Sequence, residues 1–114
     1  MGNVKSGQRW VFDSDADISS PADGVTRKIL AFCSEAMCVA HCFKQGAVGA
    51  LHNHPQTQIT YVAEGVFEFE IDGEVKTVNK GDTMLKQDGV VHGCKCLEKG
   101  VLIDFFTPMS DDFI

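Results

Sequence analysis

The stretch VFEFEIDGEVKTV, residues 66–78, predicts an antiparallel β-hairpin. The apolar side chains at positions 67, 69 and 71 alternate with glutamates, which is the period of a strand with one buried face. Asp72 and Gly73 follow, and both residue types tolerate the positive φ that a type I′ turn requires. Residues 75–78 then return as the second strand, so this part of the chain is expected to be β-structure.

Short strand patterns continue on both sides of this hairpin. In chain order they lie at 25–32, 37–43, 59–62, 66–71, 75–78, 83–86, 90–96 and 101–107. Glycine, aspartate and other turn residues separate them at regular intervals, and no segment keeps a helical period over three turns. About eight short strands spaced in this way predict an all-β sandwich or barrel.

Length and charge limit the remaining possibilities. A chain of 114 residues is expected to form a single domain, with an N-terminal polar arm over 1–24, a loop at 19–24, and the β-domain over 25–114. The net charge of −6 disfavours nucleic acid and anionic membranes as partners. No apolar run has the length of a membrane span and the first residues are too polar for a signal peptide, so we expect a cytoplasmic protein.

The cysteines indicate packing rather than cross-linking. There are five of them, an odd number, and no C-x-x-C pair occurs, which argues against a disulfide framework and a zinc ribbon. Cys94 and Cys96 share the strand face of His92, where a thiolate ligand is conceivable, but packing thiols are favoured. His41 lies in an alternating strand and is interpreted as a polar residue of the core or rim.

Two of the four histidines, His52 and His54, lie one residue apart. In a strand they would point to the same face, close enough to chelate one ion. Such a pair is also typical of turn histidines near a surface, so by itself it leaves both interpretations open. The wider spacing favours a metal. Gly46-x5-His52-x-His54-x3-Gln58-x6-Gly65 forms one block, and Gly81-x5-Gln87-x-Gly89-x2-His92-x3-Cys96 forms another.

These blocks resemble the two motifs of the cupin superfamily, G-x5-H-x-H-x3/4-E-x6-G and G-x5-P-x-G-x2-H-x3-N. Every glycine and histidine of the motifs is present, whereas Gln58, Gln87 and Cys96 replace the glutamate, the proline and the asparagine. The resemblance implies a single-domain cupin, a double-stranded β-helix or jelly roll, with a metal in the barrel mouth. The implied ligands are His52, His54, Gln58 and His92.

The implied cofactor is one divalent transition metal, with Zn or Ni expected first and Mn, Fe and Cu also open. Three imidazoles and the neutral amide of Gln58 would leave the full charge of the metal in place, which suits the binding of an anionic substrate. In the alternative interpretation Gln58 is a spectator and the protein supplies three ligands.

The apolar run at 101–107 contains one carboxylate, Asp104, on the same strand face as Leu102 and Phe106. A buried carboxylate is costly unless it is paired or protonated, so its presence suggests a function. If this face lines the barrel, Asp104 could act as general base and acid, with Phe106 as an apolar wall for a sugar ring. The alternative, an ion pair of Asp104 with a basic residue such as Arg27, is equally open.

Longer stretches are similar to the pectin-degradation cupins (KdgF-like), namely residues 44–49, 58–62, 91–94, 100–108 and 111–114. This resemblance implies ring opening and ketonisation of 4,5-unsaturated uronates to linear 4-deoxy-5-keto-uronate. It also implies Gln58 as a metal ligand and Asp104 and Phe106 in the substrate site. One position departs, because Ser110 stands where an arginine is expected to hold the uronate carboxylate. That carboxylate would then be held by the metal and by Arg27 or Lys28, or the substrate differs.

Two other functions fit the same patterns. One is an Fe(II)-dependent dioxygenase acting on a small thiol or diketone, and the other is a non-catalytic sugar-binding cupin. Exposed strand edges, together with the habit of the family, favour a homodimer.

Overall fold

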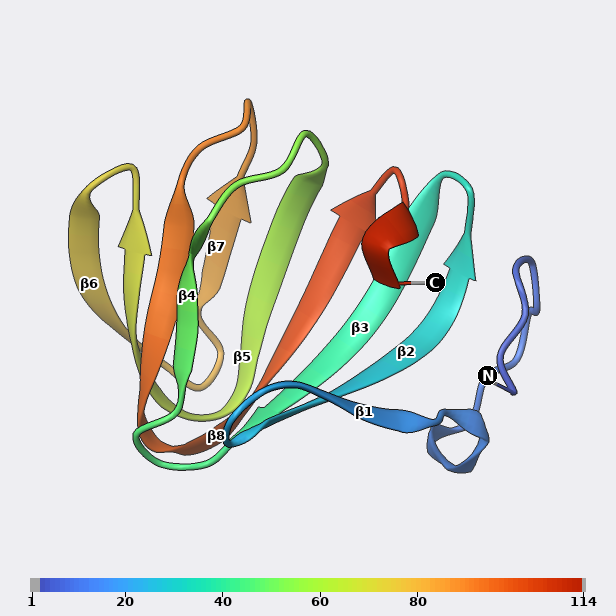
Figure 1. Cartoon of the computed structure of the whole chain (residues 1–114), viewed down its shortest axis with the longest axis horizontal. Helices are drawn as coiled ribbons and strands as arrows, with labels where there is room; N and C mark the ends of the chain where they lie inside the picture. Colours follow the sequence, from blue (N-terminus) through green and yellow to red (C-terminus); the bar gives the residue numbers. More distant parts are fainter. Residues whose placement is uncertain (1–2, 114) are drawn as a thin grey trace.

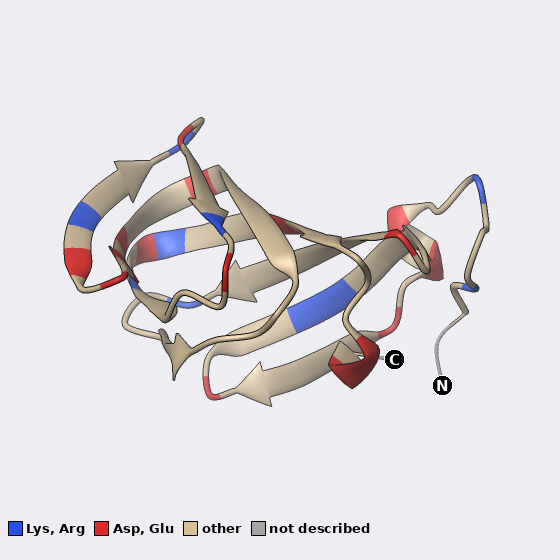
Figure 2. Ribbon diagram, turned by 90° about the horizontal axis from the view of Figure 1, so that it is seen from above, with Lys and Arg blue, Asp and Glu red and all other residues tan. Residues whose placement is uncertain are grey.

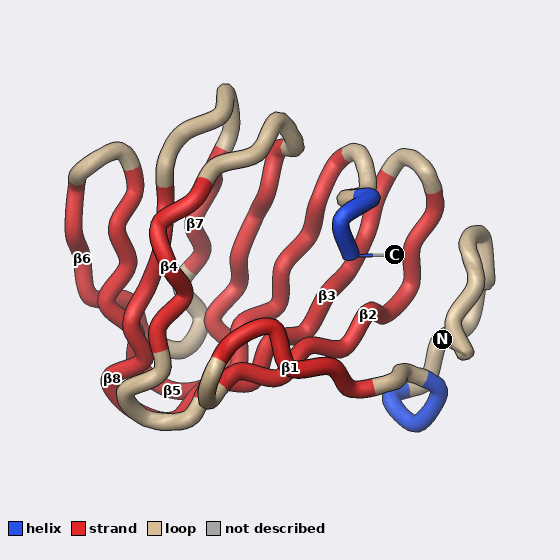
Figure 3. The backbone as a smooth tube through the Cα atoms, viewed as in Figure 1, coloured by secondary structure: helices blue, strands red, loops and turns tan. Residues whose placement is uncertain are grey.

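The computed structural model describes residues 3–113, which fold into one eight-stranded antiparallel sheet that curls upon itself (Figure 1). In chain order the strands are β1 (Ile18–Ala22), β2 (Val25–Cys33), β3 (Ala36–Phe43), β4 (Val48–His52), β5 (Thr57–Ile71), β6 (Glu74–Asn79), β7 (Thr83–Lys86) and β8 (His92–Thr107). The helical elements among these residues are two 3-10 turns, η1 (Asp13–Asp15) and η2 (Asp111–Phe113) (Figure 3). The predicted all-β class is therefore confirmed.

The hairpin that the sequence predicts at its centre is present. β5 and β6 pair antiparallel from Val66↔Asn79 to Ile71↔Glu74. Asp72 and Gly73 join them with φ values of 51° and 80°, the two positive values that a type I′ turn needs.

β5 and β8 form the centre of the fold and pair with each other along most of their length. The sequence predicted two separate strands for each, which is wrong, because the chain bends at glycines without leaving the sheet. A Cβ at Gly65 would lie 2.5 Å from the carbonyl oxygen of Lys99, and a Cβ at Gly100 would lie 2.3 Å from that of Glu64. The two backbones thus approach more closely than side chains allow, and the register shifts at this point.

Two strands had no signal in the sequence. The loop expected at 19–24 is wrong, since Ile18–Ala22 forms β1 and pairs with β2, and Val48–His52 forms β4 beside β8. All five residues of β1 and four of the five in β4 are exposed, so neither strand shows apolar alternation and backbone pairing alone defines both. The boundary between arm and domain stays a prediction, and residues 1, 2 and 114 lie outside the described residues.

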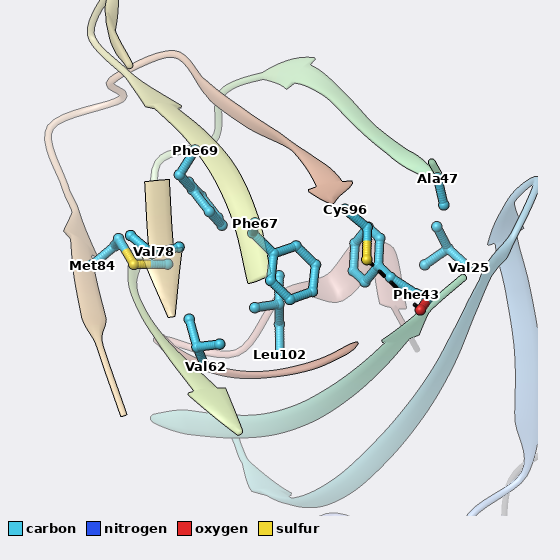
Figure 4. Close-up of a cluster of buried hydrophobic side chains, with 10 residues drawn as sticks. All are labelled: Val25, Phe43, Ala47, Val62, Phe67, Phe69, Val78, Met84, Cys96 and Leu102. Atoms are coloured by element: carbon cyan, nitrogen blue, oxygen red, sulfur yellow. Dashed lines mark hydrogen bonds between the residues drawn. The ribbon is translucent and has the colours of Figure 1, made fainter. Parts of the chain in front are cut away.

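The inside of the curled sheet has an apolar part and a polar part. Ten buried residues form the main core, in which Phe43 and Phe67 meet edge to face at 5.2 Å (Figure 4). Toward the end of the barrel where the β4–β5 loop and η2 lie, the inward positions of β5, β7 and β8 carry polar side chains. These are Gln58, Thr60, Lys86, His92 and Asp104, all buried. Buried polar groups need hydrogen-bond partners. These five side chains belong to the candidate site described below.

The surface carries both signs of charge. Lys and Arg positions are dispersed among Asp and Glu along the ribbon (Figure 2). Among residues 3–113 no helix is long and apolar enough to cross a membrane.

Candidate active site

Three histidines converge where β4 ends and β8 begins. His52 and His92 are opposite one another in the β4–β8 pair, and their ring centroids are 4.4 Å apart. His54 follows in the β4–β5 loop, with its centroid 5.1 Å from that of His92. The nitrogen atoms that could bind a metal all lie within 4.8 Å of one another. The structure thus brings together three of the four residues that the cupin motifs imply as ligands.

All three rings are held in the same tautomer by the backbone. Nδ1 of His52 lies 2.8 Å from the carbonyl of Ala50, Nδ1 of His54 lies 3.0 Å from that of Gln56, and Nδ1 of His92 lies 3.0 Å from that of Val90. A carbonyl oxygen only accepts, so Nδ1 carries the proton in each ring. In the neutral ring Nε2 then keeps its lone pair, which is the state in which imidazole binds a metal.

Gln58, the fourth implied ligand, lies on the buried face of β5 with one end against the histidines. Its Nε2 donates to Oδ1 of Asp104 at 2.8 Å. Because a carboxylate only accepts, this contact decides which end of the amide is nitrogen. Oε1 consequently faces Nε2 of His54 at 2.8 Å. Two acceptors this close repel unless one cation binds both of them.

Nε2 of His92 is a further atom suited to bind a cation. This atom is buried and has no hydrogen-bond partner among the described residues. Burial lowers the pKa of His92 to about 4, and the Lys86 ammonium contributes in the same direction, so the ring is neutral at pH 7. Buried polar atoms are rarely left unpaired. The orphaned nitrogen and the facing acceptors fit a divalent ion held by the three histidines and Gln58.

Asp104 is buried beside this cluster, with 4% of its surface exposed. Its Oδ1 accepts from Nε2 of Gln58 and, at 2.5 Å, from Oγ1 of Thr60, while Oδ2 accepts from Nδ1 of His41 at 2.6 Å. Burial by itself raises the pKa of Asp104, but His41, through its hydrogen bond and through its charge when protonated, together with the Lys86 ammonium, holds the pKa below its usual value. Asp104 is therefore a carboxylate, the state that a general base requires.

The sequence left open an ion pair of Asp104 with a basic strand residue such as Arg27, and the residue in contact with the carboxylate is His41 of β3 rather than Arg27. Nε of Arg27 donates instead to Nε2 of His41 at 3.0 Å, so His41 lies between the two charges. Lys28, the other basic candidate on β2, is bound to Asp13 at 2.9 Å on the outside.

Lys86 is the least expected member of the site. Its side chain is 1% exposed, and Nζ donates to Oγ1 of Thr60 and lies 4.9 Å from the ring centroid of Phe69. Burial lowers its pKa from 10.5 to about 8, and the negative charge of Asp104 opposes part of that effect. The ammonium, Thr60 and Asp104 thus form one buried polar chain.

These side chains surround a cavity of 420 Å³ that opens at the barrel mouth. Its volume is in the range of small-molecule sites. The residues with polar chemistry that line it are Arg27, His41, His52, Asn53, His54, Gln58, His92, Asp104, Ser110 and Asp112, and Phe106 forms an apolar wall beside His54. Cys94 also lines the cavity, but burial raises the pKa of its thiol to about 12, whereas Cys96 packs in the core. Cys94 is consequently a protonated packing thiol.

The C-terminal turn η2 covers one side of the cavity. The ring of Phe113 lies edge-on to Phe106 at 5.3 Å and to His41 at 6.3 Å, and the Arg27 guanidinium lies 3.8 Å above its centroid. Ser110, which replaces the expected arginine, is 6% exposed and lines the same cavity. The arginine that lines this cavity is therefore Arg27 of β2 and not a residue at position 110.

His41, Thr60 and Lys86 were not assigned to the site from the sequence. Each lies on the inward face of its strand, and alternation indicated that much for His41 on β3. The signal that could have found them is strand register, because Thr60 is opposite Asp104 and Lys86 is opposite Gln58. Register between distant strands is not contained in a local pattern.

Comparison with known proteins agrees with this architecture. The model of the family described as "Cupin domain" matches residues 40–106, and the chain belongs to the cupin family. The double-stranded β-helix implied by the two motifs is thus confirmed. The relatives below show which branch of the family it resembles.

The chain is 38% identical over 109 residues to the pectin degradation protein KdgF of Dickeya dadantii (strain 3937), covering 94% of this chain and 99% of that protein. The structure of KdgF from Halomonas sp. superposes with a TM-score of 0.88 at 34% identity, covering 94% and 99%. An RmlC-like cupin from Shewanella frigidimarina NCIMB 400 gives a TM-score of 0.90 at 35% identity, covering 95% and 97%.

Proposed function

We propose that this cupin is a metal-dependent enzyme of sugar-acid catabolism. It would convert 4,5-unsaturated uronates, released from pectin or alginate, into linear 4-deoxy-5-keto-uronate. The observation that carries this proposal is the position of the Gln58 amide in the cavity. Its oxygen lies beside the three histidines that could bind a metal, and its nitrogen donates to the buried carboxylate of Asp104. The similarity to a pectin degradation protein supports the choice of substrate class.

The bound metal, with Zn or Ni proposed first, would supply a Lewis acid that polarises the substrate carboxylate and the ring oxygen. Asp104 takes the proton of the anomeric hydroxyl as the ring C–O bond breaks, and the bonding pair goes to the former ring oxygen, which becomes an enolate. The same carboxyl returns the proton to the adjacent ring carbon, which gives the ketone. The reaction is an isomerisation and needs no oxidant or reductant.

Arg27 and Phe106 would hold the sugar. Arg27 has five N–H donors, and one of them is used on His41, so its terminal groups are available to a carboxylate. It lines the cavity, whereas Lys28 is bound outside it. Phe106 offers an apolar surface to one face of the ring. This arrangement would take over the role for which an arginine at position 110 was expected.

The test is to mix metal-loaded protein with unsaturated galacturonate or guluronate-derived monomers and follow the loss of the ultraviolet absorbance of the ring double bond. Wild-type protein should accelerate the loss over the spontaneous rate, and Asp104→Asn should retain metal but lose the acceleration. Binding of the sugar without turnover would favour the sugar-binding alternative. Oxygen consumption with thiols or diketones by the iron-loaded protein would favour the dioxygenase.

We also propose that the protein acts as a cytoplasmic homodimer. The outer face of β5, β7 and β8 exposes Ile59, Tyr61, Leu85 and Phe105 by 40–54%, and Ile59 is opposite both Leu85 and Phe105. A contiguous apolar patch on a sheet is typical of an association surface. This face, rather than the strand edges, is the surface on which we expect the second copy.

A further inference from the structure

Three side chains from neighbouring strands form a line, and the proposed reaction uses the two at its ends, Arg27 and Asp104, but not His41 between them. Arg27 of β2 is directly opposite His41 of β3, and β3 lies beside β8, which carries Asp104. Nε of Arg27 is 3.0 Å from Nε2 of His41, and Nδ1 of His41 is 2.6 Å from Oδ2 of Asp104. Both ring nitrogens of His41 are therefore engaged.

The donors and acceptors in this line fix the proton on His41. A guanidinium nitrogen can only donate, so Nε2 of His41 must accept from Arg27. The ring proton is then on Nδ1, from which it is donated to Asp104. A doubly protonated ring would place its Nε2–H against the N–H of Arg27, and a ring protonated only at Nε2 would lose both contacts. The geometry thus selects the neutral Nδ1–H tautomer.

The same contacts distinguish the two oxygens of Asp104. Oδ1 accepts from Gln58 and from Thr60, and these two donors occupy its lone pairs. Oδ2 accepts a single hydrogen bond, from His41, and keeps one lone pair. His41 itself lines the cavity. Oδ2 is the oxygen that can take a proton from a molecule bound there.

We propose that His41 is a positioning residue for Asp104, held in the Nδ1–H tautomer by Arg27, and that it aims the free lone pair of Oδ2 at the substrate. The proposal rests on the proposed function and adds the reacting atom and its support. It also gives Arg27 two tasks, because the guanidinium that would bind the substrate carboxylate is the one that orients His41. Binding of a uronate and placement of the base are thereby linked.

Phe113 packs against Arg27 and His41 and restricts the movement of both side chains. Its ring packs under the Arg27 guanidinium at 3.8 Å and edge-on to His41 at 6.3 Å. Phe43 contacts His41 from the core side, with centroids 6.5 Å apart. Rings on two sides keep water from competing for the His41 hydrogen bonds, and hydrogen bonds shielded from water are stronger.

Two variants separate positioning from packing. His41→Phe keeps a ring of similar shape but no donor, and we expect kcat to fall by about a hundredfold, as for a catalytic group displaced by about 1 Å. Metal content should stay within threefold of wild type, and KM should change less than kcat because Arg27 keeps its stacking on Phe113. His41→Asn restores an N–H near the place of Nδ1 and should recover part of the lost kcat. Cys42→Ser, an exposed neighbour on β3, is the matched control and should retain wild-type kcat.

A nuclear magnetic resonance measurement tests the arrangement without substrate. In ¹⁵N-labelled, metal-loaded protein, His41 should show a protonated Nδ1, with its proton shifted downfield by the short bond to a carboxylate and the shift lost in Asp104→Asn. A protonated Nε2, or a His41→Phe variant with kcat within twofold of wild type, would overturn the proposal. A wild-type protein that shows the Nδ1–H tautomer but no uronate turnover would overturn the proposed function while supporting the arrangement of His41.

Discussion

The buried ammonium of Lys86 destabilises the folded protein at neutral pH, and its replacement by methionine should show how much. The side chain is 1% exposed, and its pKa falls from 10.5 to about 8 on folding. At about 1.4 kcal/mol per pKa unit, this difference corresponds to about 3 kcal/mol of stability lost when the group is charged. The pKa of about 8 already includes the attraction of Asp104, so Lys86→Met, which removes the charge and keeps a side chain of similar length, should be more stable at pH 7 by up to about 3 kcal/mol.

The pH dependence gives the sign of the effect. Between pH 8 and 10.5 the unfolded chain binds a proton at this lysine and the folded chain does not, so the stability of the wild type rises with pH through that window. Below pH 8 the full cost of the charge is present. Lys86→Met lacks this contribution. The advantage of the variant should therefore be greatest at pH 7 and nearly absent at pH 10.5.

Urea unfolding of metal-free protein, followed by circular dichroism at pH 7 and pH 10.5, measures this difference. Lys76→Met is the matched control, because Lys76 is 72% exposed in a loose pair with Glu74 and should change stability by less than about 0.5 kcal/mol. A Lys86→Met variant that is less stable than wild type at pH 7, or equally more stable at both pH values, would refute the reasoning.

The activity of Lys86→Met should move in the opposite direction from its stability. The Lys86 charge lowers the pKa of Asp104, so that pKa should rise in the variant and the acidic limb of the pH–rate profile should shift to higher pH. A residue that lowers stability while it acts on a proposed catalytic group would be a common compromise at active sites. An unchanged acidic limb would show that Lys86 does not act on Asp104.

Other substitutions test the proposed metal site, the close glycine contact between β5 and β8, and the proposed dimer surface. Gln58→Glu should retain metal but lower kcat at least about tenfold, because a carboxylate at this position cannot donate a hydrogen bond to Asp104. A charge-assisted hydrogen bond is worth about 1.5–3 kcal/mol. Metal analysis and kinetics measure the two effects, and full activity would contradict the prediction. His92→Ala should weaken metal binding at least about tenfold in calorimetric titration. Gly65→Ala should lower the free energy of unfolding by about 3 kcal/mol, because its Cβ would meet the Lys99 carbonyl, whereas Gly46→Ala, with the same φ of 84° and open space, should have a smaller effect. Tyr61→Lys should convert the proposed dimer to a monomer in sedimentation without loss of metal.

The sequence by itself determined the elements whose information is local. Alternation of apolar residues and the Asp72-Gly73 pair gave the central hairpin, because the period of a strand and the φ of a turn depend on adjacent residues. The histidine spacing predicted the cluster for the same reason, since His52, His54 and Gln58 lie within seven residues of the chain. Only His92 lies far away in the sequence, and its place in the cluster was predicted from the second motif.

The tertiary structure decided which distant residues meet. β1 and β4 have exposed residues and no period, so only backbone pairing with β2 and β8 reveals them. The partner of Asp104 is His41 rather than Arg27, and Lys86 reaches the same group through Thr60. Alternation tells which side chains face inward, but their partners depend on the register of strands that are far apart in the chain. That register is fixed by the close glycine contact between β5 and β8 and by burial of the shared core.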